Sequence, residues 1–171
     1  MNPFAVQTFE YRLESLIASL SDYVRNFYGI DHLNEAGQMD KILTPRVIVM
    51  PASNPKDIGL PAGPAGDQPY VVTTEVMVFV ETPLIIDNPA GSPARVEGKA
   101  AVHDPTCEAI RQWLKDNREG IEVPSEIIAL GCEQVVFGMW SRNPPERGSD
   151  RIGNLYWRHV FFVILQNMEV T

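Results

Sequence analysis

The residues of this sequence best suited to bind a metal ion or to transfer a proton are its histidines and cysteines. They are His32, His103 and His159, with Cys107 and Cys132. His103 stands directly before Asp104, and both residue types are common metal ligands. However, Asp104 followed by Pro105 is the pattern of a helix N-cap, and no second or third ligand lies nearby at a metal-binding spacing. The sequence therefore predicts no metal site.

Catalysis is not indicated by the remaining candidates. Cys107 lies near the start of an expected helix, a favourable place for a reactive thiol, but no base beside it can be named from the sequence. His159 lies among aromatic residues, where we expect a structural role. Cys107 and Cys132 lack CxxC spacing, so we expect two buried thiols and no disulfide. The sequence has no Gly-rich phosphate loop, HExxH motif or nucleophile elbow, so we expect no catalytic residue, no cofactor and no enzymatic activity.

The charge of the chain argues against tight binding of nucleic acid. The formal net charge is -8, from 14 Lys and Arg against 22 Asp and Glu. Binding to phosphates needs clustered cations, and Arg147 and Arg151 alternate with acidic residues in an expected solvated loop. The longest apolar run, 160–165, is too short to span a bilayer, and the N-terminus has no signal-peptide pattern. We expect a cytoplasmic protein, or one packaged into a particle that is assembled in the cytoplasm.

The elements that must position these residues begin with a long amphipathic helix. Asn2 and Pro3 form a favourable helix start, and Gly29 a favourable end, so the helix is expected to cover about 3–28. Its apolar stripe recurs at steps of three and four. The stripe consists of Phe9, Leu13, Leu16, Ile17, Leu20, Val24 and Phe27.

The rest of the chain predicts four strands and a second helix. Strands are expected at Arg46–Met50, Tyr70–Glu81, Glu133–Arg142 and Leu155–Val170, and a helix from Asp104 to about Asn117–Gly120. That helix is expected to bury Ile110, Trp113 and Leu114, with Cys107 or Thr106 one turn earlier. Pro- and Gly-rich insertions near 52–69, 87–98 and 143–154 are expected to be loops. The order α-β-β-α-β-β predicts a single α+β domain over 1–171, with an antiparallel sheet covered by helices on one face.

The last expected strand is apolar on both of its faces. Trp157, Phe161, Val163 and Leu165 lie on one side. The other side carries Tyr156, Arg158, Val160, Phe162 and Ile164. A sheet with helices on one side normally leaves its other face polar. Two explanations remain open: loops of the same chain cover this second face, or a neighbouring subunit does, in which case these five residues form the subunit interface.

The order of elements resembles the tail-terminator family of tailed bacteriophages, also called tail-completion or minor tail proteins of the neck. The residues that carry the resemblance are the amphipathic helix at 3–28, the strand Arg46–Met50 and the segment Gln68–Val72 that begins the long strand. The helix Asp104–Asp116 and the C-terminal segment Arg158–Ile164 complete it.

The resemblance implies a ring, usually of six subunits, that ends the tail tube and offers a surface to the head–tail connector. It implies a virion protein of the neck, assembled in the host cytoplasm, with DNA passing through an acidic lumen without specific binding. The loops 52–69 and 143–154 are expected to contact the tube protein and the neck. Their candidate residues are Pro61, Pro64, Pro144, Pro145, Arg147 and Arg151. A head-completion or adaptor protein, a non-viral interaction module and a small enzyme or metal protein are the alternatives.

Overall fold

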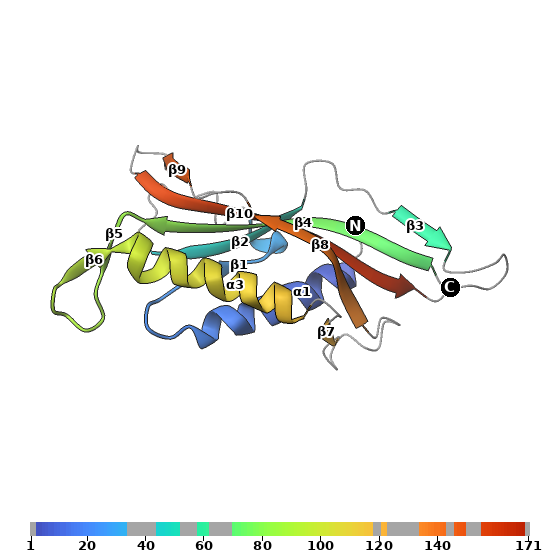
Figure 1. Ribbon diagram of the computed structural model, residues 1–171, viewed down its shortest axis with the longest axis horizontal. Helices are drawn as coiled ribbons and strands as arrows, with labels where there is room; N and C mark the ends of the chain where they lie inside the picture. Colours follow the sequence, from blue (N-terminus) through green and yellow to red (C-terminus); the bar gives the residue numbers. More distant parts are fainter. Residues whose placement is uncertain are drawn as a thin grey trace.

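Two helices lie side by side on one face of a mixed β-sheet in the computed structural model of this chain (Figure 1). The structure describes residues 3–33, 44–51, 58–61, 70–117, 121–122, 134–142, 146–149 and 155–169. The helical segments are α1 (Pro3–Ser19), η1 (Ile30–His32), η2 (Lys99–His103) and α3 (Asp104–Asp116). The strands are β1 (Asn26–Tyr28), β2 (Arg46–Pro51), β3 (Ile58–Pro61), β4 (Tyr70–Pro83), β5 (Ile85–Asp87), β6 (Arg95–Glu97), β7 (Ile121–Glu122), β8 (Gln134–Arg142), β9 (Glu146–Ser149) and β10 (Leu155–Glu169).

The long strands β4 and β10 form the centre of the sheet. They pair antiparallel along their whole length, from Tyr156 opposite Pro83 to Glu169 opposite Tyr70. The strand order is β1-β2-β4-β10-β8-β7, with β3 paired to β4 and β9 paired to β10. The pair β1–β2 is parallel, whereas the other pairs of this sheet are antiparallel. Strands β5 and β6 form a separate two-stranded sheet.

The structure confirms the α+β class but differs from the predicted order α-β-β-α-β-β. The four predicted strands correspond to β2, β4, β8 and β10. The segments expected to be loops contain further short strands: β3 lies within 52–69, β6 within 87–98 and β9 within 143–154. Strand β3 pairs with the end of β4, β9 pairs with the end of β10, and β6 pairs with β5. Pro and Gly in a sequence limit where a strand can run, but they do not prevent a short edge strand.

The prediction that the first helix continues to residue 28 is wrong, because α1 ends at Ser19. Hydroxyl groups near this end compete for the helical carbonyls: Ser15 donates to the carbonyl of Tyr11, and Ser19 donates to that of Leu16. Arg25 then turns back, and its guanidinium donates to backbone carbonyls at Leu20 and Tyr23, which holds the turn that follows the helix.

The C-terminal part of the predicted apolar stripe therefore lies outside the helix. Val24 is 71% exposed in the turn, and Phe27 lies in β1, where it is half-buried against the core. Gly29 does not end the helix, since it follows β1. The apolar residues after Ser19 continue the helical spacing of three and four by coincidence, although they lie in a turn and a strand.

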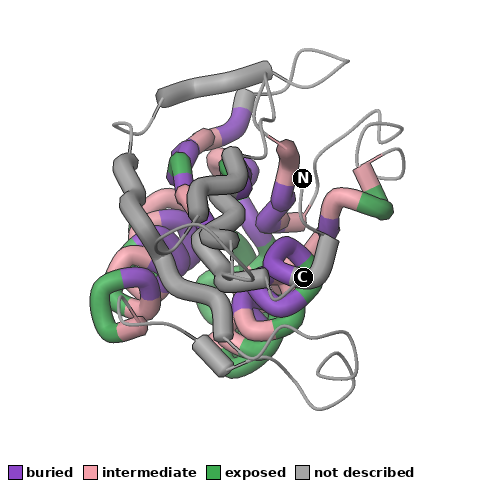
Figure 2. The backbone as a smooth tube through the Cα atoms, turned by 90° about the vertical axis from the view of Figure 1, so that its right-hand side faces the viewer, coloured by how far each residue is buried: buried purple, intermediate pink, exposed green. Residues whose placement is uncertain are grey.

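The core lies between the helices and the sheet. Buried residues alternate with exposed ones around each helix (Figure 2). The buried cluster contains Ala5, Val6, Phe9, Leu13 and Ile17 of α1, Cys107, Ile110 and Leu114 of α3, and Val47, Val49, Val76, Val78, Val80, Phe161, Val163 and Leu165 of the strands. The expected buried face of the second helix is confirmed, with Trp113 partly buried against this cluster.

The start of α3 differs from the predicted N-cap. The chain is already helical over η2, a π-helical turn that runs directly into α3. Asp104 therefore does not act as an N-cap, and its carboxylate instead pairs with Lys99 at 2.8 Å. No helix among the described residues is both long and apolar enough to cross a membrane.

Candidate functional site

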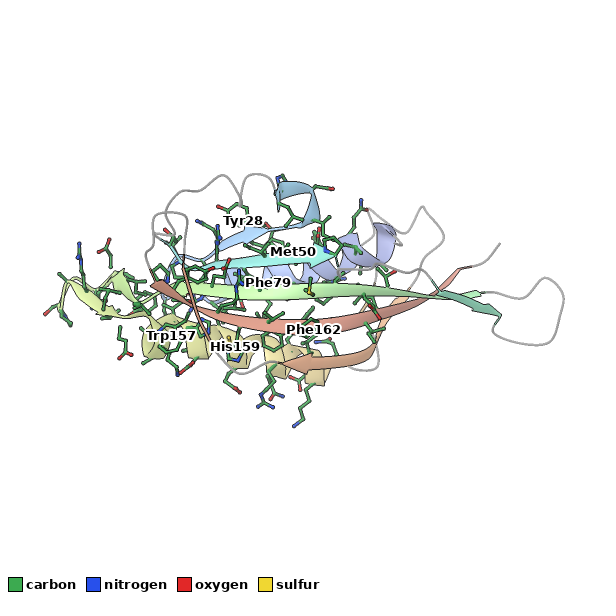
Figure 3. All side chains as sticks on the ribbon, turned by 90° about the horizontal axis from the view of Figure 1, so that it is seen from above. Tyr28, Met50, Phe79, Trp157, His159 and Phe162 are labelled. Atoms are coloured by element: carbon green, nitrogen blue, oxygen red, sulfur yellow. The ribbon has the colours of Figure 1, made fainter. Side chains whose placement is uncertain are left out.

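The first candidate site is the face of the sheet opposite the helices, which we call the helix-free face. The strand register places on it Tyr28, Arg46, Ile48, Met50, Glu75, Met77, Phe79, Glu81, Tyr156, Arg158, Val160, Phe162 and Ile164. Figure 3 views the molecule from this side, with α1 and α3 behind the sheet. All five residues predicted for a subunit interface lie on this face.

Exposure on the helix-free face varies among the apolar residues of β10. Tyr156 is 6% exposed and Val160 is 7% exposed, so both are buried within the chain. Phe162 is 39% exposed, and Ile164 beside it is half-buried. The neighbouring strands contribute the half-buried Met50, Met77 and Phe79 around Phe162. The accessible apolar part of the predicted interface is thus centred on Phe162 (Figure 3).

A buried carboxylate organises the other end of the helix-free face. Glu81 is 2% exposed, and its Oε1 accepts from Nε of Arg46 at 3.1 Å and from Nη2 at 3.0 Å. Its Oε2 accepts from Nε and Nη2 of Arg158 at 3.4 and 3.3 Å. The Arg158 guanidinium also lies over the rings of Phe79 and Tyr156, with centroid distances of 5.1 and 5.8 Å. Burial, and after it the charge of Glu81, raise the pKa of Tyr156.

The residues predicted to contact partners through loops do not gather in one place. Pro61 is the last residue of β3, and Arg147 lies in β9 opposite Trp157. These two strands lie at opposite ends of the molecule (Figure 1). Pro64, Pro144, Pro145 and Arg151 lie outside the described residues.

The second candidate site is a buried cluster that the sequence analysis missed. His103 ends η2, Cys107 lies one turn later in α3, and His159 reaches them from the helix side of β10. The Nε2 of His103 lies 3.2 Å from Nδ1 of His159, and the Sγ of Cys107 lies 3.2 Å from that Nδ1 and 3.8 Å from the Nε2. The two imidazole rings stack with centroids 5.3 Å apart.

Burial keeps His103, one member of this cluster, uncharged. His103 is 0% exposed, Cys107 1% and His159 4%. Burial, and next the charge of His159, lower the pKa of His103 from 6.5 to about 4, so His103 is a neutral imidazole at pH 7. Its Nδ1 is hydrogen-bonded to Oγ1 of Thr82 at 3.0 Å, which leaves Nε2 directed at the other two side chains. A buried cluster of nitrogen and sulfur atoms of this kind is suited to bind an ion, but a substrate in solution could not reach it.

One sequence signal for the cluster was available. The spacing of His103 and Cys107 is i, i+4, which places both side chains on one face of a helix. The approach of His159 depends on the position of β10 under this helix, which no local pattern reports. The third histidine, His32, is exposed and lies elsewhere.

An acidic hollow of about 480 Å³ lies between α1 and the segment β1–η1. It is lined by Gln7, Glu10, Tyr11, Glu14, Phe27, Tyr28, Gly29, Asp31 and His32. The backbone N–H of Ile30 donates to Oε1 of Glu10 at 2.8 Å. Burial raises the pKa of Glu10, and the Ile30 hydrogen bond opposes that rise. This contact holds the two segments together.

The fold thus offers two candidate sites with different properties. The helix-free face is wide and partly open, and it suits contact with another macromolecule. The His103–Cys107–His159 cluster is small and closed. Comparison of the chain with protein-family models and with curated proteins gives no match.

Proposed function

We propose that this chain is a non-catalytic structural protein of a phage neck, which assembles with copies of itself through the helix-free face. In the form implied by the resemblance, the copies make a ring, usually of six subunits, that ends the tail tube and joins it to the head–tail connector. The observation that carries the proposal is the exposure of Phe162 among Met50, Met77, Phe79 and Ile164, on the side of the sheet that has no helix.

The composition of the helix-free face supports a protein–protein contact. Aromatic residues, methionine and arginine are enriched in the cores of such contacts. Burial of a large apolar side chain is worth about 1.5–3 kcal/mol when it is complete, and the half-buried residues around Phe162 would each gain part of that amount. A cluster of partly open apolar groups therefore provides the driving force for association.

The charges on the face favour a second copy of the chain as the partner. Two arginines surround the single carboxylate of Glu81 at one end, which leaves this end cationic. Glu75 is exposed at the other end, opposite Ile164. Another copy therefore carries a carboxylate for the arginine end and a guanidinium for the Glu75 end.

The shape of the molecule supports contacts with two further partners. The segments that contain Pro61 and Arg147 lie at opposite ends, as a subunit between a tail tube and a connector requires (Figure 1). The end of β4 that pairs with β3, and the end of β10 that pairs with this part of β4, extend beyond the helices (Figure 1). A net charge of -8 suits a ring whose lumen DNA passes without binding.

The proposal is tested by changing Phe162→Asp and measuring the mass of the particle by light scattering and its shape by negative-stain microscopy. The wild type should form rings, and the variant should form smaller particles with unchanged circular dichroism. The control is Tyr11→Asp, which places the same charge on an aromatic residue that is 48% exposed on the helix side. This control should assemble normally.

A wild-type chain that is monomeric at all concentrations up to about 100 µM would contradict the proposal, since interfaces of standard size form below this range. Equal loss of assembly in both variants would also contradict it, because the effect would then not be specific to the helix-free face.

A further inference from the structure

We propose that His103, Cys107 and His159 form a buried site for one zinc ion, which links the start of α3 to the central strand β10. The three side chains come from two parts of the chain, and the two histidines are 56 residues apart in the sequence. Their ligand atoms all lie within 4.8 Å of one another. This inference is independent of the proposed function.

The distances between the ligand atoms match those of a metal site. The three separations are 3.2, 3.2 and 3.8 Å. A point equidistant from the three atoms lies about 2.0 Å from each, and Zn–N and Zn–S bonds are about 2.0–2.1 and 2.3 Å long. An ion slightly out of the plane of the three atoms therefore reaches all of them with little movement of the side chains.

Hydrogen bonds explain the convergence of these atoms less completely than an ion does. If Nδ1 of His159 donates to Nε2 of His103, then this Nδ1 cannot accept from the thiol of Cys107, which is also 3.2 Å away. If the thiol donates to Nδ1 instead, an Nε2–H of His103 has to share the same acceptor, because Nδ1 of His159 offers only one lone pair to two donors that are each 3.2 Å away. One ion at the common point satisfies all three lone pairs together.

The surroundings hold the His103 ligand as a metal site requires. Thr82 is hydrogen-bonded to Nδ1 of His103 at 3.0 Å, and such a contact to the second ring nitrogen fixes the orientation of a ligating imidazole. The helical spacing of His103 and Cys107 sets their separation without a loop.

The donor set selects the class of ion. Two imidazoles and one thiolate suit zinc and similar borderline ions, whereas calcium and magnesium prefer oxygen ligands. On binding, the thiol of Cys107 loses its proton to solvent and becomes a thiolate ligand. The three ligands are buried in the core, so the ion would stabilise the fold by cross-linking α3 and β10.

The test uses the full-length chain, purified in reducing buffer, stripped of metal with a chelator and titrated with Co²⁺, which reports its ligands by absorbance. We expect one equivalent to bind, with a thiolate-to-cobalt charge-transfer band and the intense visible bands of a low-coordinate site. Zn²⁺ should displace the cobalt and raise the Tm of the wild type. Cys107→Ser should lose the charge-transfer band, and His159→Gln should weaken binding by about 10-fold or more.

The matched controls are Cys132→Ser and His32→Gln, which should bind cobalt like the wild type. If the site variants do not fold, the wild type still decides, through the stoichiometry of cobalt binding and the thiolate-to-cobalt charge-transfer band. A folded wild type that binds neither ion, or a Cys107→Ser variant with the wild-type spectrum, would overturn the proposal and leave the cluster as a hydrogen-bonded part of the core.

Discussion

Replacement of Glu81 by glutamine should be among the most destabilising conservative changes on the helix-free face. Glu81 is 2% exposed and holds two guanidinium groups, one on each oxygen. Glutamine keeps the shape of the side chain but removes its charge, and its amide N–H₂ must face one of the arginines. The variant therefore leaves two cations close together at a nearly buried position.

The expected loss follows from the burial of each partner. Removal of one partner from a buried ion pair costs about 3–5 kcal/mol. Arg158 is 36% exposed and can be partly solvated, so the loss for Glu81→Gln should lie at the lower end, about 3 kcal/mol. Arg46 is 11% exposed and approaches to 3.0 Å, so Arg46→Gln should cost about 2 kcal/mol. Arg158→Gln, at 3.3 Å or more, should cost about 1 kcal/mol or less.

Urea unfolding followed by tryptophan fluorescence gives these free energies, at one fixed protein concentration and with the particle mass of each variant recorded. The decisive result is the order of the three variants. A loss below about 1 kcal/mol for Glu81→Gln would refute the buried ion-pair argument. Equal losses for Arg46→Gln and Arg158→Gln would refute the reasoning from burial.

Two further changes test the packing. Gly98→Ala should destabilise the fold by about 2 kcal/mol in thermal or urea unfolding, because its Cβ would lie 2.1 Å from the backbone carbonyl oxygen of Pro83. Gly29→Ala, whose Cβ would meet only the flexible carboxylate of Glu10 at 2.7 Å, should cost less, and the reverse order would show that the contact is misjudged. Because the pKa of Glu10 is raised, its folded state holds the proton more tightly than the unfolded chain, and this stability is lost as the pH rises through the folded pKa. Glu10→Gln should therefore be more stable than the wild type at pH 7 and equal to it at pH 4. A gain in stability that persists at pH 4 would contradict the direction of the pKa shift of Glu10. The control is Glu14→Gln, which changes an exposed carboxylate of the same helix.

The local patterns of the sequence were enough to predict most long elements. The runs of β-branched residues that became β2, β4 and β10 were placed within two residues of their observed ends. The buried face of α3 was also predicted, because apolar residues at helical spacing lie on one side of a helix, and that side packs against the core. The end of α1 was not, since the turn depends on Arg25 reaching back to carbonyls of earlier residues.

Pairing of distant strands decided what the patterns left open. The short strands β3 and β9 form because they pair with the ends of the long strands, β3 with β4 and β9 with β10, whose backbone groups can take a further partner. Their residues carry little strand signal of their own. The prediction of loops in these segments failed for this reason.

The sequence by itself determined that β10 has two apolar faces, because alternation along one strand is a local property. Only the tertiary structure decided which of those faces the helices cover and that Phe162 is the exposed large apolar residue among the β10 side chains that the structure describes. The tertiary structure also decided two contacts between polar side chains that are far apart in the sequence. Glu81 meets Arg158 across 77 residues, and His103 meets His159 across 56, through a strand register that packing of the whole core fixes.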